Sequence, residues 1–213
     1  MKKFLVALAV TSAITAPAHA ETAILGFTGG TTFDFFADNE TVGWSFVANS
    51  DLTVTDLGWF SPSGNDLNSS HTVGIWNLAG LLLGSATIDP GAVDGTGYRY
   101  VSSSPFILSS GQQYVIGGNI SDSDDDQYVT FADSVDTDPL ISFAGTAVSP
   151  IGSGFAFAND INANGVGRFG ANFQFLPGAV PEPATWAFMI FGFGAIGGAM
   201  RRQRKANVKV SYA

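Results

Sequence analysis

The chain has 213 residues, no cysteine and a formal net charge of −9. The lack of cysteine excludes a disulfide framework and thiol chemistry. Between residues 21 and 178, two basic residues, Arg99 and Arg168, stand against 17 acidic residues, which leaves a net charge of −15. Because such a section repels phosphate groups, nucleic-acid binding is disfavoured.

The first 20 residues have the features of an export signal. Lys2 and Lys3 supply a basic start, and the apolar core follows from Phe4 to Val10. Ala18 and Ala20 flank a single residue, which is the small-x-small pattern of a signal cleavage site. We predict cleavage after Ala20, so this segment contributes nothing to the folded domain.

Short strand patterns dominate the section from residue 21 to residue 178. No stretch of it keeps a 3.6-residue apolar period, whereas apolar residues occupy every second position from Phe169 to Phe175. Turn-forming Gly, Asn, Asp and Ser separate the apolar runs. We predict strands over residues 23–27, 42–48, 52–59, 72–77, 81–88, 98–102, 112–120, 128–132, 141–148, 155–158 and 169–175.

This pattern predicts an all-β fold, a β-sandwich that is jelly-roll-like. The apolar parity changes between Val54 and Leu57, which predicts a β-bulge near Asp56. Two segments, residues 71–88 and 111–117, are similar to exported bacterial β-sandwich modules to which no activity is assigned.

Three features follow one another after the predicted sandwich. They are a Pro-Glu-Pro hinge, an apolar run from Ala184 to Met200, and a basic cluster of Arg201, Arg202, Arg204 and Lys205. The apolar run has 17 residues, which as a helix measure about 26 Å, against about 30 Å for a hydrocarbon core. Trp186 and the arginines can extend it by lying at the interfaces. The basic cluster predicts a cytoplasmic C-terminus.

The hinge and the start of the apolar run resemble the PEP-CTERM sorting signal of Gram-negative bacteria, in its PEPxxWA variant. The residues that carry this resemblance are Pro181, Glu182, Pro183, Trp186 and Ala187. The resemblance implies recognition by an exosortase, cleavage near the hinge, and transfer of the preceding domain to the cell surface or an exopolysaccharide matrix. The alternative is a plain C-terminal membrane anchor.

Acidic residues are concentrated in the loop before residue 128. Asp122, Asp124 and Asp126 have the 1, 3, 5 spacing of a calcium loop. Position 6 is Gln127, where the tight turn of an EF-hand needs glycine, and no flanking helices are predicted. The three aspartates are therefore a candidate calcium site of a looser kind, and the alternative is a solvated acidic turn.

Catalytic residues are not predicted. His71 is the single histidine between residues 21 and 178, and no serine lies in a G-x-S-x-G elbow. One histidine without cysteine also disfavours zinc. For sugar stacking, Trp44 and Trp59 share their strand parity with core residues, so Trp76 is the candidate exposed ring.

These observations predict five segments: a signal peptide at 1–20, a β-sandwich ectodomain at 21–178, a hinge at 179–183, a transmembrane helix at 184–200 and a basic cytoplasmic tail at 201–213.

We expect a non-enzymatic structural or adhesive protein of a Gram-negative bacterium, associated with exopolysaccharide. Its expected partners are an exosortase-type enzyme and the inner membrane, with the ectodomain periplasmic before it is processed to the surface or matrix. No cofactor other than calcium is expected. The alternative is a carbohydrate-binding module or a small carbohydrate-active enzyme.

Overall fold

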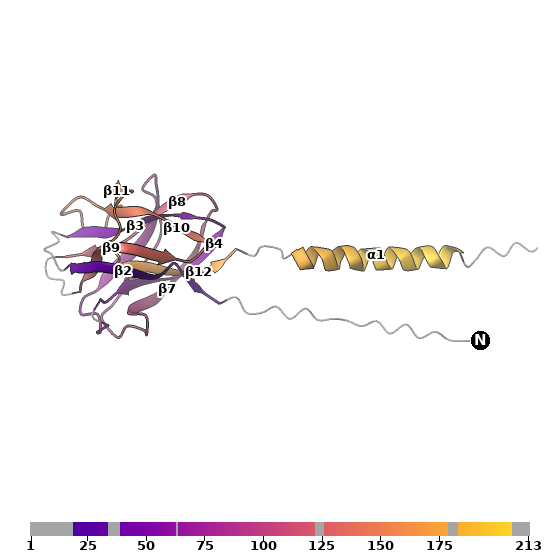
Figure 1. Cartoon of the computed structure of the whole chain (residues 1–213), viewed down its shortest axis with the longest axis horizontal. Helices are drawn as coiled ribbons and strands as arrows, with labels where there is room; N and C mark the ends of the chain where they lie inside the picture. Colours follow the sequence, from indigo (N-terminus) through magenta and orange to yellow (C-terminus); the bar gives the residue numbers. More distant parts are fainter. Residues whose placement is uncertain (1–18, 34–38, 63, 122–125, 179–182, 206–213) are drawn as a thin grey trace, which may run out of the picture. The chain divides into compact units, whose positions relative to one another are not determined.

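The computed structural model describes residues 19–33, 39–62, 64–121, 126–178 and 183–205. The chain divides into two compact units, Met1–Gly178 and Ala179–Ala213. The first unit is built of strands and the second contains one helix (Figure 1).

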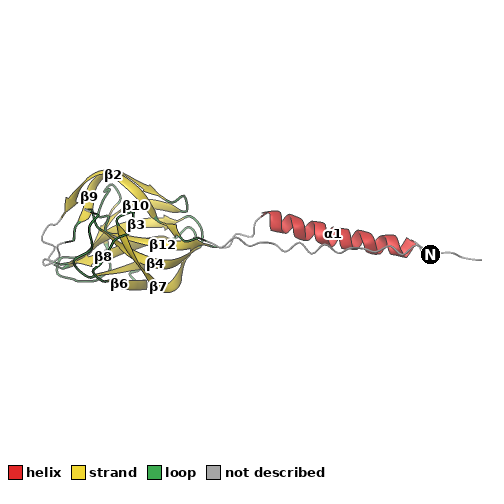
Figure 2. Ribbon diagram, turned by 90° about the horizontal axis from the view of Figure 1, so that it is seen from below, coloured by secondary structure: helices red, strands yellow, loops and turns green. Residues whose placement is uncertain are grey.

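The first unit contains two antiparallel sheets and a two-stranded ribbon (Figure 2). The strand orders are β1-β12-β4-β7, β11-β10-β3-β8-β5-β6 and β2-β9. The bounds are β1 (Glu21–Thr22), β2 (Ile24–Phe33), β3 (Glu40–Ala48), β4 (Leu52–Phe60), β5 (His71–Asn77), β6 (Leu82–Ile88), β7 (Tyr98–Leu108), β8 (Gln113–Ile120), β9 (Tyr128–Thr137), β10 (Ile141–Val148), β11 (Asp160–Asn162) and β12 (Ala171–Pro177). The predicted all-β, sandwich-like architecture is confirmed, and the jelly-roll connectivity stays a prediction.

The two large sheets pack face to face through aromatic side chains. Trp44 of β3 stacks on Phe173 of β12 with ring centroids 6.2 Å apart, and both side chains are fully buried. The indole Nε1 of Trp44 also donates a 2.8 Å hydrogen bond to the carbonyl oxygen of Ala171. A polar bond thus crosses the apolar core and fixes the two layers against each other.

The ribbon β2-β9 is joined to the sandwich by hydrogen bonds, a β-bridge and aromatic packing. Val129 forms a β-bridge with Phe169, and the Phe27 ring stacks on the Phe169 ring at 5.2 Å. Phe27 also contacts Phe60 of β4 edge to face, at 5.3 Å. The inner side of the ribbon therefore faces the core, while its outer side is exposed.

The predicted burial of Phe169, Ala171, Phe173 and Phe175 is confirmed, but Asn172 between them is also fully buried, so this segment is covered on both faces. The bulge near Asp56 is confirmed as well, because the pairing of β4 with β7 shifts between Val54 and Asp56.

The strand predicted over residues 155–158 is wrong, because those residues form no strand and a short strand, β11, follows them instead. Their apolar alternation has a different cause. The rings of Phe155 and Phe157 pack on Trp76, with centroids 5.0 and 6.4 Å away.

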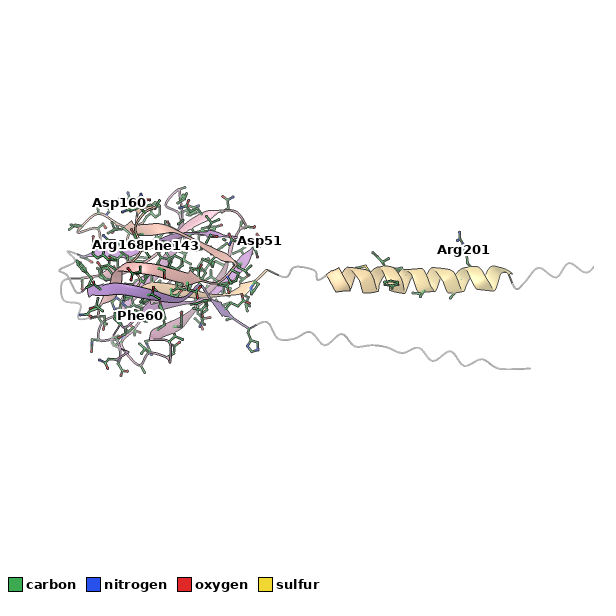
Figure 3. All side chains as sticks on the ribbon, in the orientation of Figure 1. Asp51, Phe60, Phe143, Asp160, Arg168 and Arg201 are labelled. Carbon is green, nitrogen blue, oxygen red and sulfur yellow. The ribbon has the colours of Figure 1, made fainter. Side chains whose placement is uncertain are left out.

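The second unit contains the helix α1 (Pro183–Lys205). Its described apolar side chains are exposed: Met189, Ile190, Phe191, Phe193, Ile196 and Met200. The side chain of Arg201 is exposed near the end of the helix (Figure 3). By length and apolarity, no helix among the described residues qualifies as one that crosses a membrane.

Candidate functional site

A buried histidine is the centre of the most polar arrangement inside the sandwich. His71 begins β5 and is 0% exposed. Its Nδ1 lies 3.1 Å from the carbonyl oxygen of Asn119, and its Nε2 lies 3.2 Å from Oδ2 of Asp126. The Asn119 carbonyl oxygen only accepts, so a hydrogen bond there needs a proton on Nδ1, and a bond to the Asp126 carboxylate needs one on Nε2.

The Asp126 carboxylate is held by further donors. The backbone N–H of Asn68 donates to both of its oxygens, at 3.0 and 2.9 Å, and that of Ser69 donates to Oδ2 at 2.7 Å. The side-chain amide of Asn68 adds a longer bond of 3.3 Å. Asp126 thus connects the loop before β5 with the segment before β9.

Trp59 extends this arrangement to the second sheet. Its indole stacks on the His71 ring with centroids 4.2 Å apart and an angle of 8° between the planes. Glycines make room for the indole, because a Cβ on Gly118 or Gly170 would lie within 2.6 Å of its ring atoms. We call Trp59, His71, Asn119 and Asp126 the His71 cluster.

The pKa of Asp126 reflects two opposing effects. Burial by itself raises it, but the hydrogen bonds from His71 and from the backbone N–H groups of Asn68 and Ser69 outweigh burial, and the pKa is lowered from its ordinary value of 3.8. The carboxylate is therefore ionised at neutral pH. A charged hydrogen bond then joins β5 to the loop before β9.

We expect the stabilising effect of Asp126 to be lost in acid. A carboxyl group whose pKa is lower in the folded than in the unfolded state stabilises the fold above the unfolded value, and this stabilisation disappears as the pH falls through the folded value. The difference in unfolding free energy between the wild type and Asp126→Asn should therefore shrink below pH 3.8. Urea denaturation of both proteins at a series of pH values measures this difference. A difference that does not change with pH would contradict the prediction.

The candidate calcium residues are placed only in part. Asp122 and Asp124 lie outside the described residues. The carboxylate of Asp126 already accepts the bonds given above and is 8% exposed, so the expectation that it belongs to a solvated turn is wrong. Among the described residues no group of three His, Cys, Asp or Glu is arranged to hold a metal. A calcium site in this loop stays a prediction.

A polar pocket of about 240 Å³ lies beside Asp126. It is lined by Ser61, Pro62, Asn65, Asp66, Asn68, Asp126 and Gln127. The His71 ring does not line it. A molecule in this pocket meets amide, hydroxyl and carboxylate groups rather than the imidazole.

Trp76 is not the exposed ring that the sequence predicts. It is 4% exposed, and Phe155 and Phe157 cover it. The covering segment arrives from nearly 80 residues further along the chain, so local strand parity gives no sign of it. Trp44 and Trp59 are fully buried, as predicted.

The sorting residues lie at the beginning of the second unit. Pro181 and Glu182 lie outside the described residues, while Pro183, Trp186 and Ala187 belong to the first turns of α1. Arg201, Arg202, Arg204 and Lys205 form its last turns. Of the two signal-cleavage residues, Ala18 lies outside the described residues and Ala20 is exposed just before β1.

The pairing of His71 with Asp126 is absent from the sequence prediction. The two residues are 55 positions apart, and no spacing rule connects them. The one available signal is that a single histidine begins a strand whose other residues are mostly apolar, which indicates burial and therefore a partner.

The second unit carries a known sorting motif. Residues 179–205 match the PEP-CTERM protein-sorting motif, which marks an exported, envelope-associated protein. Among solved structures, CBM35 from Cellvibrio japonicus Abf62 shares 15% identity over 62% of this chain and 86% of its own, with a TM-score of 0.29. That likeness is too weak to assign a function. Comparison with curated proteins gives no match.

Most of the β-sandwich domain, from the end of β2 to the segment before β12, matches a protein family. Residues 32–166, more than half of the chain, match the family described as domain of unknown function DUF4082. The predicted resemblance to a PEP-CTERM protein with an exported ectodomain is confirmed. The chain therefore belongs to the DUF4082 family and carries a PEP-CTERM sorting motif after its β-sandwich domain.

Proposed function

We propose that this protein is a non-enzymatic structural or adhesive component of the bacterial envelope that associates with exopolysaccharide. The observation that carries the proposal is the sorting motif at residues 179–205. The motif marks a chain whose preceding domain is delivered outside the cell. What is delivered here is one acidic β-sandwich, and such a domain suits a soluble matrix component.

The His71 cluster supports a structural role rather than a catalytic one. A general base must reach a substrate proton, directly or through one water. His71 is fully buried and both of its ring nitrogens face oxygens of the protein, those of Asn119 and Asp126. Its contacts join β5, β8 and the loop before β9. A residue that connects three segments in this way stabilises the fold.

The exposed apolar side chains of α1 support temporary anchoring in the inner membrane. The 17 residues from Ala184 to Met200 fall a few ångströms short of a hydrocarbon core by length. Arg201 at the end of the run carries its charge on a long flexible stem that can reach the head groups. In this proposal the basic end lies in the cytoplasm and the sandwich in the periplasm until an exosortase cleaves near the hinge.

We expect Glu182→Ala to leave the protein in the membrane fraction, because the altered residue belongs to the Pro-Glu-Pro sequence that the processing enzyme reads. Exchange of Arg201, Arg202, Arg204 and Lys205 for glutamine should have the same result, since the sorting signal then loses its basic end. Immunoblots of membrane, surface and medium fractions against the sandwich domain measure the distribution in a host with an exosortase.

The matched control is Asp160→Ala, which removes one exposed carboxylate from β11 without touching the motif. This variant should be processed like the wild type. Equal release of Glu182→Ala and the wild type would overturn the proposed sorting route. Release of both from a host that lacks the exosortase would indicate an ordinary protease instead.

A further inference from the structure

One exposed aromatic residue has a backbone conformation that its side chain disfavours. Phe131 in β9 has a φ of 53° and an exposed fraction of 76%. A bulky residue with positive φ is a conformational outlier, because its Cβ crowds the neighbouring carbonyl oxygen. Such outliers gather at sites of function. Neither the backbone nor the core gains from a phenyl ring at this position.

The surrounding backbone explains why the chain bends there. The pairing of β2 with β9 shifts between Thr28 and Gly29, and Gly30 beyond the shift also has a positive φ, of 89°. Ala132 donates its N–H to the carbonyl oxygen of Val166, which fixes β9 on its other edge. This geometry requires a residue that tolerates positive φ, for which glycine is the ordinary choice.

Polar side chains belong to the same stretch of the ribbon, since Thr28 pairs with Ser134 and Asp133 lies two residues beyond Phe131. The hydroxyls of Thr28 and Ser134 are hydrogen-bonded at 2.8 Å and exposed. The carboxylate of Asp133 is packed over Gly29, within 2.7 Å of the position that a Cβ would take there. It forms no hydrogen bond with another described residue, so its oxygens can accept from a ligand. The same stretch of ribbon thus carries an exposed apolar ring, two hydroxyl groups and a carboxylate.

This combination fits one face of a sugar ring. The C–H groups of a pyranose pack on an aromatic face, while its hydroxyls donate to carboxylates and exchange hydrogen bonds with threonine and serine. The net charge of −15 on the section from residue 21 to residue 178 repels polyanions, which favours a neutral glycan.

Other occupants fit the ribbon less well. A stable protein partner needs about 800 Å² on each side with an apolar centre. The ribbon offers only two large exposed apolar side chains among its described residues, Leu25 and Phe131. Insertion into an anionic membrane is opposed by the acidic charge.

We propose that the outer face of the β2-β9 ribbon, centred on Phe131, binds a neutral polysaccharide of the extracellular matrix. This inference rests on the proposed association with exopolysaccharide and names the surface that makes the contact. Phe131 supplies the stacking ring, and Asp133 with the Thr28–Ser134 pair supplies the hydrogen-bonding groups.

The test uses the full-length protein and the neutral exopolysaccharide fraction of the producing bacterium, immobilised on beads. We expect Phe131→Ala to weaken binding about tenfold or more, because the stacking contact is lost. Phe131→Trp should retain binding, since the larger ring offers the same face. Ile107→Ala is the matched control, because Ile107 is 68% exposed on β7 and lies outside the ribbon.

A second measurement separates a binding role from a structural one. Phe131→Gly should bind as weakly as Phe131→Ala, yet its melting temperature should be no lower than that of the wild type and should rise by about 2–4 °C as the backbone strain is relieved. A drop of several degrees would show that the ring supports the fold and would overturn the argument.

The two proposals fail in different ways. If the wild type binds neither the neutral nor the acidic fraction, the association with exopolysaccharide is wrong, and this inference falls with it. If the wild type binds and Phe131→Ala binds equally well, only the assignment to the ribbon is wrong. Preference for the acidic fraction would contradict the charge argument.

Discussion

Replacement of His71 by alanine should lower the free energy of unfolding by about 3–5 kcal/mol. The change removes one hydrogen-bond donor from the Asp126 carboxylate, which is 8% exposed and keeps its bonds from Asn68 and Ser69. It also opens a cavity against the Trp59 indole, which stacks on the imidazole at 4.2 Å. Urea denaturation of the purified protein at neutral pH measures the loss.

A double-mutant cycle with Asp126→Asn shows whether the pair is the cause. If the loss comes mainly from the donor that Asp126 loses, His71→Ala should cost less in the Asp126→Asn background than in the wild type. Asp160→Asn, on the exposed strand β11, is the matched control and should change stability by no more than about 0.5 kcal/mol. Additive effects of the two cluster mutations would indicate that cavity formation dominates.

The parts of the fold that were predicted correctly depend on short-range patterns. Apolar alternation from Phe169 to Phe175 is visible in the sequence because each of these residues faces the same buried layer. The bulge at Asp56 is visible because one inserted residue reverses the parity of a strand. The sorting motif is equally local, since its hinge, apolar run and basic cluster follow one another along the chain.

The parts that were missed depend on contacts between distant segments. Residues 155–158 alternate like a strand, but they cover Trp76 instead of joining a sheet. Phe155 and Phe157 lie in the loop before β11, whereas Trp76 lies in β5. The alternation of apolar residues within one of these segments gives no information about its contact with the other. The same prediction error therefore produced a false strand and a false exposed tryptophan.

The candidate site was harder to predict than the fold. His71, Trp59 and Asp126 come from three separate segments, and only the pairing of the sheets brings them together. The strain at Phe131 is likewise invisible in sequence, because it accompanies a register shift at which β9 carries one residue more than β2. The net charge, by contrast, can be counted from the sequence without any knowledge of contacts. Its acidic value already disfavours nucleic acid as a ligand.

Replacement of Trp44 by alanine should destabilise the protein by about 3–5 kcal/mol, because a fully buried indole fills the space between the sheets. Its ring stacks on Phe173, and its Nε1 donates to the carbonyl oxygen of Ala171 in the opposite sheet. Trp44→Phe retains an aromatic ring but removes this donor. It should therefore lower the free energy of unfolding by less than the alanine variant does. About 1–3 kcal/mol of its loss should come from the buried carbonyl oxygen of Ala171, which is left without this hydrogen bond.

Trp59→Phe is the matched control for the hydrogen bond. Trp59 is as deeply buried as Trp44, but its Nε1 has no hydrogen-bond partner among the described residues. Both substitutions shrink a buried indole to a phenyl ring, whereas only Trp44→Phe breaks a bond between the layers. We expect Trp44→Phe to be the more destabilising of the two in urea denaturation. Equal losses would show that ring volume alone holds the sheets together at Trp44, and that the bond to Ala171 contributes nothing.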